Sequence, residues 1–195
     1  MNRRDLFARL AALSAMSLSA MSLTGVTMSE AEAAAPDLEN TIYLDLTYGR
    51  VVIQLLPDIA PKHVARVKML AREGFYDGTV FHRVIEGFMA QGGDPTGTGT
   101  GGSKYGTVPA EFSNTRRFLR GTVGAARTSD PDSANSQFFI MFQPYPSLDG
   151  QYTIWGQVIS GMEFVDRIKR GSGANGLVQD PDKIVHMRVA ADVKN

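Results

Sequence analysis

The sequence has no cysteine, only three histidines and no net charge, and each of these shortages excludes a class of function. Without thiols the chain has no cysteine nucleophile, no disulfide and no thiolate metal site. Three histidines (His63, His82 and His186) leave little material for a histidine metal site. The 20 Lys+Arg residues balance 20 Asp+Glu, so no basic surface for nucleic acid is predicted. We therefore expect a protein that works without a metal or cofactor and does not bind nucleic acid.

The first 33 residues differ in composition from the rest of the chain. Arg3 and Arg4 precede a mildly apolar run of Ala, Ser, Met and Leu, which ends at Ala31-Glu32-Ala33, a pattern that suits signal peptidase. The run is too polar for a good membrane span, which favours a twin-arginine-like export signal. We expect residues 1–33 to be cleaved and residues 34–195 to form one domain in the periplasm, free of the membrane. The alternative is an amphipathic N-terminal helix packed on the domain.

The rest of the chain is predicted to be mainly β. Apolar residues alternate in 42–46 and again in 51–55, with a tight turn between them, which predicts a hairpin. Further strands are predicted over 80–85, 88–91, 122–126, 137–142, 152–158 and 184–189. In the last of these, Val185, Met187 and Val189 are expected on one face. Helices are predicted from Pro61 to before Gly74 and over 162–169. Many strands with two helices favour a closed barrel or a sandwich.

Several chemical motifs are weaker than they first look. The run Gly97–Gly102 has the letters of a dinucleotide-binding loop, but no helix is predicted after it, which favours a flexible surface loop. Arg116, Arg117 and Arg120 are a small basic cluster, interpreted as a solvated loop. No G-x-S-x-G elbow supports a serine hydrolase. His63 and His186 are interpreted as structural residues rather than ligands.

The segment 81–94 is the most informative part of the chain. It places Arg83 inside an apolar strand pattern, where alternation predicts Phe81, Arg83 and Ile85 on one side and His82 and Val84 on the other. Either that side is an exposed apolar face, or both faces of the sheet are apolar. In both cases the guanidinium lies against apolar surface, where its head is available to a polar ligand. The alternative is a structural ion pair with a nearby acid.

Ordered blocks of residues in this region and beyond resemble the signature of the cyclophilins. They are Phe81-His82-Arg83, residues 87–94, Glu111-Phe112, residues 121–123, residues 136–140, residues 148–150, residues 156–158, Gly161-Met162 and Val165-Asp166. The resemblance runs from about Thr41 to the C-terminus. It implies an all-β fold, a closed eight-stranded antiparallel barrel capped by two α-helices. It also implies a peptidyl-prolyl cis–trans isomerase that assists the folding of exported proteins without a cofactor.

The resemblance also implies a set of site residues. Arg83 corresponds to the catalytic arginine of the family. The apolar pocket for the proline ring corresponds to Phe88, Met89, Phe139 and Leu148. Gln91 and Gln137 correspond to polar residues that hold the peptide backbone and orient the arginine. The residues that border the groove correspond to Ala126, Arg127 and Tyr152.

Two positions depart from the family's pattern. Arg127 stands where Asn is frequent, so only the backbone role is carried over to it. Ser147 stands where the best-known members have a tryptophan that helps to bind cyclosporin, and Trp155 lies in a different strand. We therefore expect weak cyclosporin binding, with proline-containing peptides and unfolded exported proteins as partners of a monomer. A proline-peptide binding module or holdase with little turnover is the rival interpretation.

Overall fold

The computed structural model describes residues 37–194, so the predicted export signal lies outside the described residues. Eight strands are present: β1 (Thr41–Leu46), β2 (Gly49–Leu55), β3 (Arg83–Ile85), β4 (Met89–Gly92), β5 (Thr122–Ala125), β6 (Phe138–Met141), β7 (Ile154–Ser160) and β8 (Ile184–Val189). The helices are α1 (Pro61–Arg72) and α2 (Met162–Val165), with short 3-10 turns η1 (Leu38–Asn40), η2 (Pro146–Leu148) and η3 (Ala190–Asp192). Within residues 37–194, no helix is both long and apolar enough to cross a membrane.

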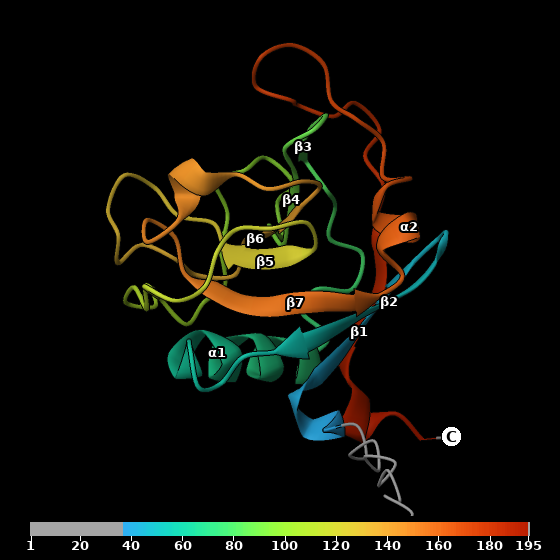
Figure 1. Ribbon diagram of the computed structural model, residues 1–195. Coiled ribbons are helices and arrows are strands. Elements are labelled where there is room, and N and C mark those ends of the chain that lie inside the picture. Colours follow the sequence, from blue (N-terminus) through green and yellow to red (C-terminus); the bar gives the residue numbers. More distant parts are fainter. Residues whose placement is uncertain (1–36, 195) are drawn as a thin grey trace, which may run out of the picture. The chain divides into compact units, whose positions relative to one another are not determined.

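The eight strands form one curled antiparallel sheet in the order β3-β4-β6-β5-β7-β2-β1-β8 (Figure 1). This confirms the predicted eight-stranded antiparallel architecture, although full closure was an overstatement. No strand ladder joins the end strands β3 and β8 in the described part of the chain. The segment before β3 meets the start of β8 and the residues before it instead, through Gly78 N–H to Ile184 O at 2.8 Å and Phe81 N–H to Asp182 O at 3.0 Å. Helix α1 packs against β7 and β8, and α2 packs against β2.

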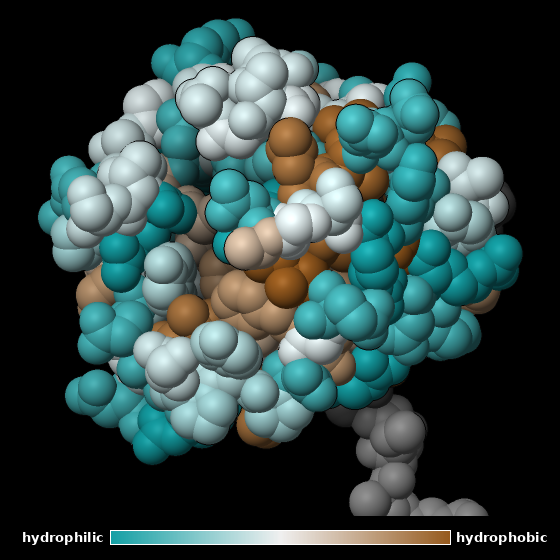
Figure 2. Space-filling view, turned by 90° about the horizontal axis from the view of Figure 1, so that it is seen from above, coloured by the Kyte–Doolittle hydropathy of each residue, from teal (hydrophilic) through white to brown (hydrophobic). Residues whose placement is uncertain are grey.

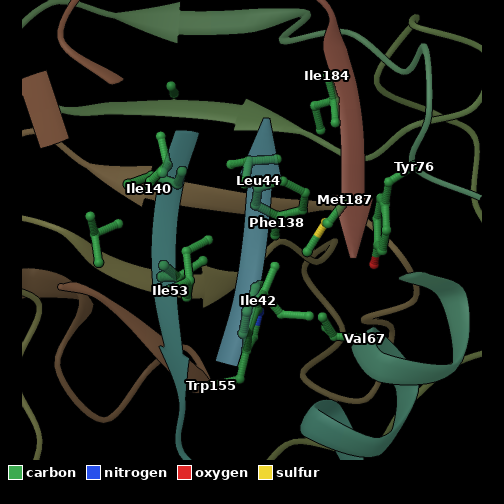
Figure 3. Packing of buried hydrophobic residues seen from close by; sticks show 14 of the residues in the cluster. Ile42, Leu44, Ile53, Val67, Tyr76, Phe138, Ile140, Trp155, Ile184 and Met187 are labelled. Atoms are coloured by element: carbon green, nitrogen blue, oxygen red, sulfur yellow. The ribbon is translucent and has the colours of Figure 1, made fainter. Parts of the chain in front are cut away.

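The interior of the curled sheet is filled by one large apolar cluster. Its members come from every strand and from α1, and those labelled in Figure 3 point toward one another: Ile42, Leu44, Ile53, Val67, Tyr76, Phe138, Ile140, Trp155, Ile184 and Met187. Phe138 contacts Tyr76, Phe81 and Trp155 edge-on at centroid distances of 5.8, 6.3 and 5.9 Å, the geometry that aromatic quadrupoles favour. This cluster supplies the rigid scaffold on which the site is built.

Three details of the predicted elements were wrong. Val185 is exposed, because a bulge opposite Asp45 and Leu46 shifts the register of β8 and Ile184 takes the inward position. Phe81 lies in the interior with Val84, since regular pairing begins only at Arg83 and the alternation does not extend back to residue 81. Helix α2 ends at Val165, and the chain continues in turns where helix was predicted to residue 169.

Helix α1 begins with a carboxylate that comes from a distant part of the chain. Pro61 occupies its first turn, and the preceding Ala60 offers no side-chain cap. Glu111 accepts hydrogen bonds from the backbone N–H groups of Lys62 and His63, both at 3.0 Å, and from His63 Nδ1 at 2.7 Å. A negative charge there satisfies unpaired N–H groups and complements the helix dipole. His63 is buried beneath this cap, which supports its structural interpretation.

The pair formed by His63 and Glu111 should make the fold sensitive to acid. Burial lowers the pKa of His63 below its ordinary value, although Glu111 acts in the opposite sense. Burial by itself raises the pKa of the Glu111 carboxyl, but hydrogen bonds from His63 and the helix N-terminus outweigh it and hold that pKa below its usual value. Both groups therefore bind protons more weakly in the folded protein than in the unfolded chain, so acidification favours unfolding.

We expect the free energy of unfolding to fall as the pH drops below 6.5, the ordinary pKa of histidine, and to fall further below 4.5, that of glutamate. Urea midpoints at pH 7.5, 5.5 and 4 measure this dependence. The control is His63→Gln, in which the dependence between pH 7.5 and 5.5 should flatten. An equally steep dependence in that variant would contradict the assignment.

Candidate active site

A second apolar cluster, which we call the outer apolar cluster, lies on the face of β4, β6 and β5 that points away from the interior. Its buried members are Met89, Phe118, Phe139, Met141 and Ile154, and its partly buried members are Leu56, Ile85, Phe88, Ala126, Leu148 and Tyr152. All the predicted proline-pocket residues belong to it, together with Ala126 and Tyr152. The fold therefore brings together predicted site residues that are up to 64 positions apart in the sequence, from Phe88 to Tyr152.

Strand register explains how this second cluster separates from the interior. Met89 pairs with Met141, and the next residues, Ala90 and Ile140, pair with each other. Because successive side chains point to opposite faces, the first pair joins the outer cluster and the second pair the interior. Strands β5 and β6 are buried at every position for this reason. Both faces of this sheet are apolar, as one of the two interpretations of the Arg83 segment required.

Gly124 makes room for the outer cluster and was not singled out by the sequence reasoning. It pairs with Phe139, and a Cβ atom at this position would lie 2.5 Å from Phe139 Cζ and 2.8 Å from Phe118 Cε1. The absent side chain lets the two rings lie nearly parallel, with centroids 5.6 Å apart and planes 22° apart. A glycine inside a strand pattern commonly marks such a close approach, so this signal was present in the sequence.

Arg127 contributes more than the backbone role carried over to it. Its guanidinium lies 4.3 Å from the centroid of the Tyr152 ring, and Tyr152 in turn meets Phe139 edge-on at 5.8 Å. The same guanidinium donates to the backbone carbonyls of Gln151 at 2.8 Å and Thr128 at 2.8 Å. These contacts hold Tyr152 against the wall of the apolar cluster.

The polar end of the site is a row of three side chains beside the apolar cluster. Arg83 Nη1 donates to Gln91 Oε1 at 3.1 Å, and Gln91 Nε2 donates to Gln137 Oε1 at 3.0 Å. Arg83 Nε donates to the carbonyl of Asn175 at 3.0 Å. No carboxylate among residues 37–194 forms an ion pair with Arg83, so the structural ion-pair alternative is wrong. The Nη2 group has no partner within that range and remains available to a ligand.

Two cavities flank this polar row. The larger, about 420 Å³, is lined by Gln91, Gln137, Ala126 and Arg127 together with the loop that contains Gly99–Gly102. The smaller, about 320 Å³, lies on the Arg83 side, against His82, Asn175 and Leu177. Figure 2 shows one face of the molecule with a patch of apolar surface ringed by hydrophilic residues. The site thus combines an apolar surface for a ring with donors that reach a peptide beside it.

The remaining candidates lie away from the reacting groups or have structural partners. Trp155 is buried in the interior and does not replace the missing tryptophan at Ser147. Arg120 pairs with Asp166, and Gly97–Gly102 forms a loop with no helix after it, as predicted. Residues 37–194 contain no cluster of His, Asp or Glu suited to a metal ion. Asn175 was missed, because its backbone carbonyl carries no signal in the sequence.

Comparison with known proteins decides which family this arrangement belongs to. The model of the cyclophilin-type peptidyl-prolyl cis–trans isomerases matches residues 41–189. The chain belongs to the cyclophilin family. A probable peptidyl-prolyl cis–trans isomerase of Brucella suis is 52% identical over 195 residues, which cover 94% of this chain and 97% of the relative. Peptidyl-prolyl cis–trans isomerase B of Bacillus subtilis is 44% identical and covers 63% of this chain and 85% of its own.

Solved cyclophilins share the fold as well as the sequence. The crystal structure of the cyclophilin AquaCyp293 from Hirschia baltica is similar with a TM-score of 0.73 and 29% identity, covering 81% of this cyclophilin and 76% of that chain. A Cryptosporidium parvum cyclophilin, crystallised in the presence of the dipeptide Ala-Pro, has a TM-score of 0.70 and 31% identity, with coverage of 80% and 99%. Membership in this family carries the activity of isomerising X–Pro peptide bonds, which confirms the predicted enzyme class.

Proposed function

We propose that this cyclophilin isomerises X–Pro bonds with Arg83 as its catalytic residue and the outer apolar cluster as its proline pocket. The observation that carries the assignment is the juxtaposition of Arg83, held by Gln91 and Asn175, with the surface formed by Phe88, Met89, Phe139 and Leu148. That a related cyclophilin was crystallised with the dipeptide Ala-Pro supports a proline-containing peptide as the ligand.

The chemistry needs no covalent step. The barrier to rotation is the amide resonance that is lost when the C–N bond twists, about 18–20 kcal/mol. An apolar pocket fixes the proline ring while the preceding carbonyl rotates, and it favours the twisted state, in which charge separation is smaller. Resonance loss leaves a lone pair on the imide nitrogen, to which the free Arg83 Nη2 group can donate. This hydrogen bond is stronger in the transition state than in the ground state, which is the requirement for catalysis.

One NMR experiment distinguishes an isomerase, which turns the peptide over, from a holdase, which only binds it. Proline-containing tetrapeptides give separate cis and trans NMR signals because their uncatalysed exchange is slow. We expect a small amount of the protein to produce exchange peaks between the two signals. Shifts of the peptide signals without exchange peaks would mean binding without turnover, and the holdase would replace the isomerase.

We further propose that the protein works in the periplasm on unfolded exported proteins, as a monomer. The proposed location rests on Arg3-Arg4, the mild apolar run and the Ala31-Glu32-Ala33 pattern, and the monomeric state on the balanced charge and the match of the whole domain to its family. Fractionation of the expressing bacterium and N-terminal sequencing of the recovered protein test it. A periplasmic protein that begins near Ala34 supports the proposal, and cytoplasmic protein that retains Met1 would contradict it. Sedimentation of the same sample measures the oligomeric state.

Cyclosporin should bind this cyclophilin weakly. Ser147 lies in η2, next to Leu148 at the edge of the apolar cluster, and offers neither the area nor the indole N–H of the family's tryptophan. We expect Ser147→Trp to tighten binding at least tenfold in a calorimetric titration, with little change in isomerase activity. Nanomolar binding by the unaltered protein would contradict this expectation.

A further inference from the structure

The loop Gly97–Gly102, interpreted above as a surface loop, is connected directly to the polar row of the site. The side-chain amide of Gln137 donates through Nε2 to the carbonyls of Gly99 at 3.0 Å and Gly101 at 2.9 Å. Gln137 Oε1 is the acceptor for Gln91, whose own Oε1 accepts from Arg83. An unbroken series of hydrogen bonds therefore runs from two backbone carbonyls of this loop to the Arg83 guanidinium.

The two ends of the series determine the direction of every bond in it. The loop carbonyls can only accept, and the guanidinium can only donate. Gln137 must therefore turn its NH₂ group toward the loop, which turns its oxygen toward Gln91. Gln91 then has to present its own oxygen to Arg83. If either amide rotated by 180°, a carbonyl would face a carbonyl or an NH₂ group would face the guanidinium, so the loop carbonyls select the orientation that holds Arg83.

A buried carboxylate holds the loop itself in place. Asp94 is fully buried and accepts hydrogen bonds from Thr96 N at 2.8 Å, Gly99 N at 2.5 Å and Gly101 N at 3.2 Å. Burial by itself raises the pKa of Asp94, but these hydrogen bonds outweigh it and keep the pKa below its usual value. A Cβ atom on Gly101 would lie 2.1 Å from Asp94 Oδ1, so only glycine permits this close approach.

We propose that the loop from Thr96 to Gly101, anchored by Asp94, is a positioning element for Arg83 that acts through Gln137 and Gln91. This inference rests on the proposed function of Arg83 and adds a role for a segment that lines the cavities beside the polar row but is not part of the apolar cluster. The loop keeps one Nη1 hydrogen of Arg83 engaged while Asn175 engages Nε, so that Nη2 faces the substrate in one direction.

Gly99→Ala tests the loop, and Gly106→Ala is its matched control. Both glycines have a positive φ, +88° and +70°, so an alanine strains the backbone at either position. At Gly99 the new Cβ lies 3.4 Å from the His82 ring, whereas at Gly106 nothing lies within 4 Å. Gly106 has no bond to the polar row. The control therefore reproduces the strain without disturbing the series.

We expect Gly99→Ala to lower kcat about tenfold, which corresponds to about 1.4 kcal/mol in the barrier, and to leave KM within about twofold. The Arg83 Nε–H NMR signal, identified by its absence in Arg83→Ala, should shift in Gly99→Ala and stay in place in Gly106→Ala. Asp94→Asn, which keeps the shape but removes acceptor capacity, should show the same two effects and serves if Gly99→Ala does not fold.

Three results would overturn the inference. They are an unchanged kcat in Gly99→Ala, whether or not the Arg83 signal moves, an effect confined to KM, and an equal loss of kcat in Gly106→Ala. The NMR signal does not depend on turnover. If the unaltered protein were inactive but the signal still moved in Gly99→Ala, the proposed function would fail and the positioning role would stand. If the unaltered protein is active and Arg83→Ala is not, a normal kcat in both Gly99→Ala and Asp94→Asn would overturn the positioning role alone.

Discussion

Arg83→Ala is expected to lower kcat/KM by about 100- to 1,000-fold, the usual cost of removing one donor that acts on developing charge. The structure offers no substitute donor at this place. Gln91 and Gln137 direct their NH₂ groups away from Arg83, toward the next acceptor in the series. The lone pair that appears on the imide nitrogen would therefore remain without a partner in the variant.

The fold should survive this change. Arg83 is only partly buried and points away from the interior, whereas its neighbour Val84 is fully buried there. Removing the guanidinium takes away two hydrogen bonds at the surface and leaves the interior cluster intact. We therefore expect an unchanged circular dichroism spectrum and a thermal midpoint close to that of the unaltered protein.

Two further variants refine the test. Arg83→Lys should recover little activity, because an ammonium group cannot engage Gln91, Asn175 and the substrate with the geometry of the planar guanidinium. Arg116→Ala is the control, since the Arg116 side chain is exposed and has no hydrogen bond or ion pair among residues 37–194. It should be fully active. A folded Arg83→Ala protein with normal kcat/KM would show that Arg83 is not the catalytic residue.

Phe139→Ala is the second large effect, and it should act mainly on binding. Phe139 is 5% exposed and contacts Phe118 and Tyr152 on either side of the apolar cluster. Truncating it opens the floor of the proline pocket, so we expect KM to rise beyond the measurable range and kcat/KM to fall at least about 30-fold, the equivalent of about 2 kcal/mol. Cavity formation should also destabilise the fold by about 3–5 kcal/mol.

Because that loss of stability could unfold the protein, Phe139→Leu is measured beside it. Leucine keeps most of the volume, so the fold should persist while the flat wall for the proline ring is lost and KM rises. Phe112→Ala is the matched control at an exposed phenylalanine, and it should change neither KM nor stability appreciably. An unaltered KM in folded Phe139→Leu would argue against a proline pocket at this place.

The sequence predicted the strands well where local pattern and family motif agree, and it predicted which side chains lie together beside the sheet. Arg83, Gln91 and Gln137 form the predicted polar group, and the apolar pocket residues gather in one cluster. What escaped prediction depends on long-range register. The bulge that exposes Val185 arises from pairing with β1, and the partner of Arg83 Nε is a backbone carbonyl 92 residues away. Neither leaves a trace in local periodicity.

The run Gly97–Gly102 shows a different limit of sequence reasoning. Its letters suggested a nucleotide loop, and the missing helix correctly excluded that function. Excluding nucleotide binding left no reason to expect a role in the site, because the loop contacts Gln137 through backbone carbonyls, which carry no signal in the sequence. Only the folded protein shows that the glycines let the loop backbone bind both Asp94 and Gln137.

The central claim is that this protein accelerates rotation about X–Pro bonds, and a protease-coupled assay on a proline tetrapeptide tests it most directly. At about 10 °C the uncatalysed step takes minutes, so acceleration is easily seen. The account predicts a rate that rises in proportion to the concentration of the protein and returns nearly to the uncatalysed value with Arg83→Ala. A rate equal to the uncatalysed one at every concentration of folded protein would contradict it.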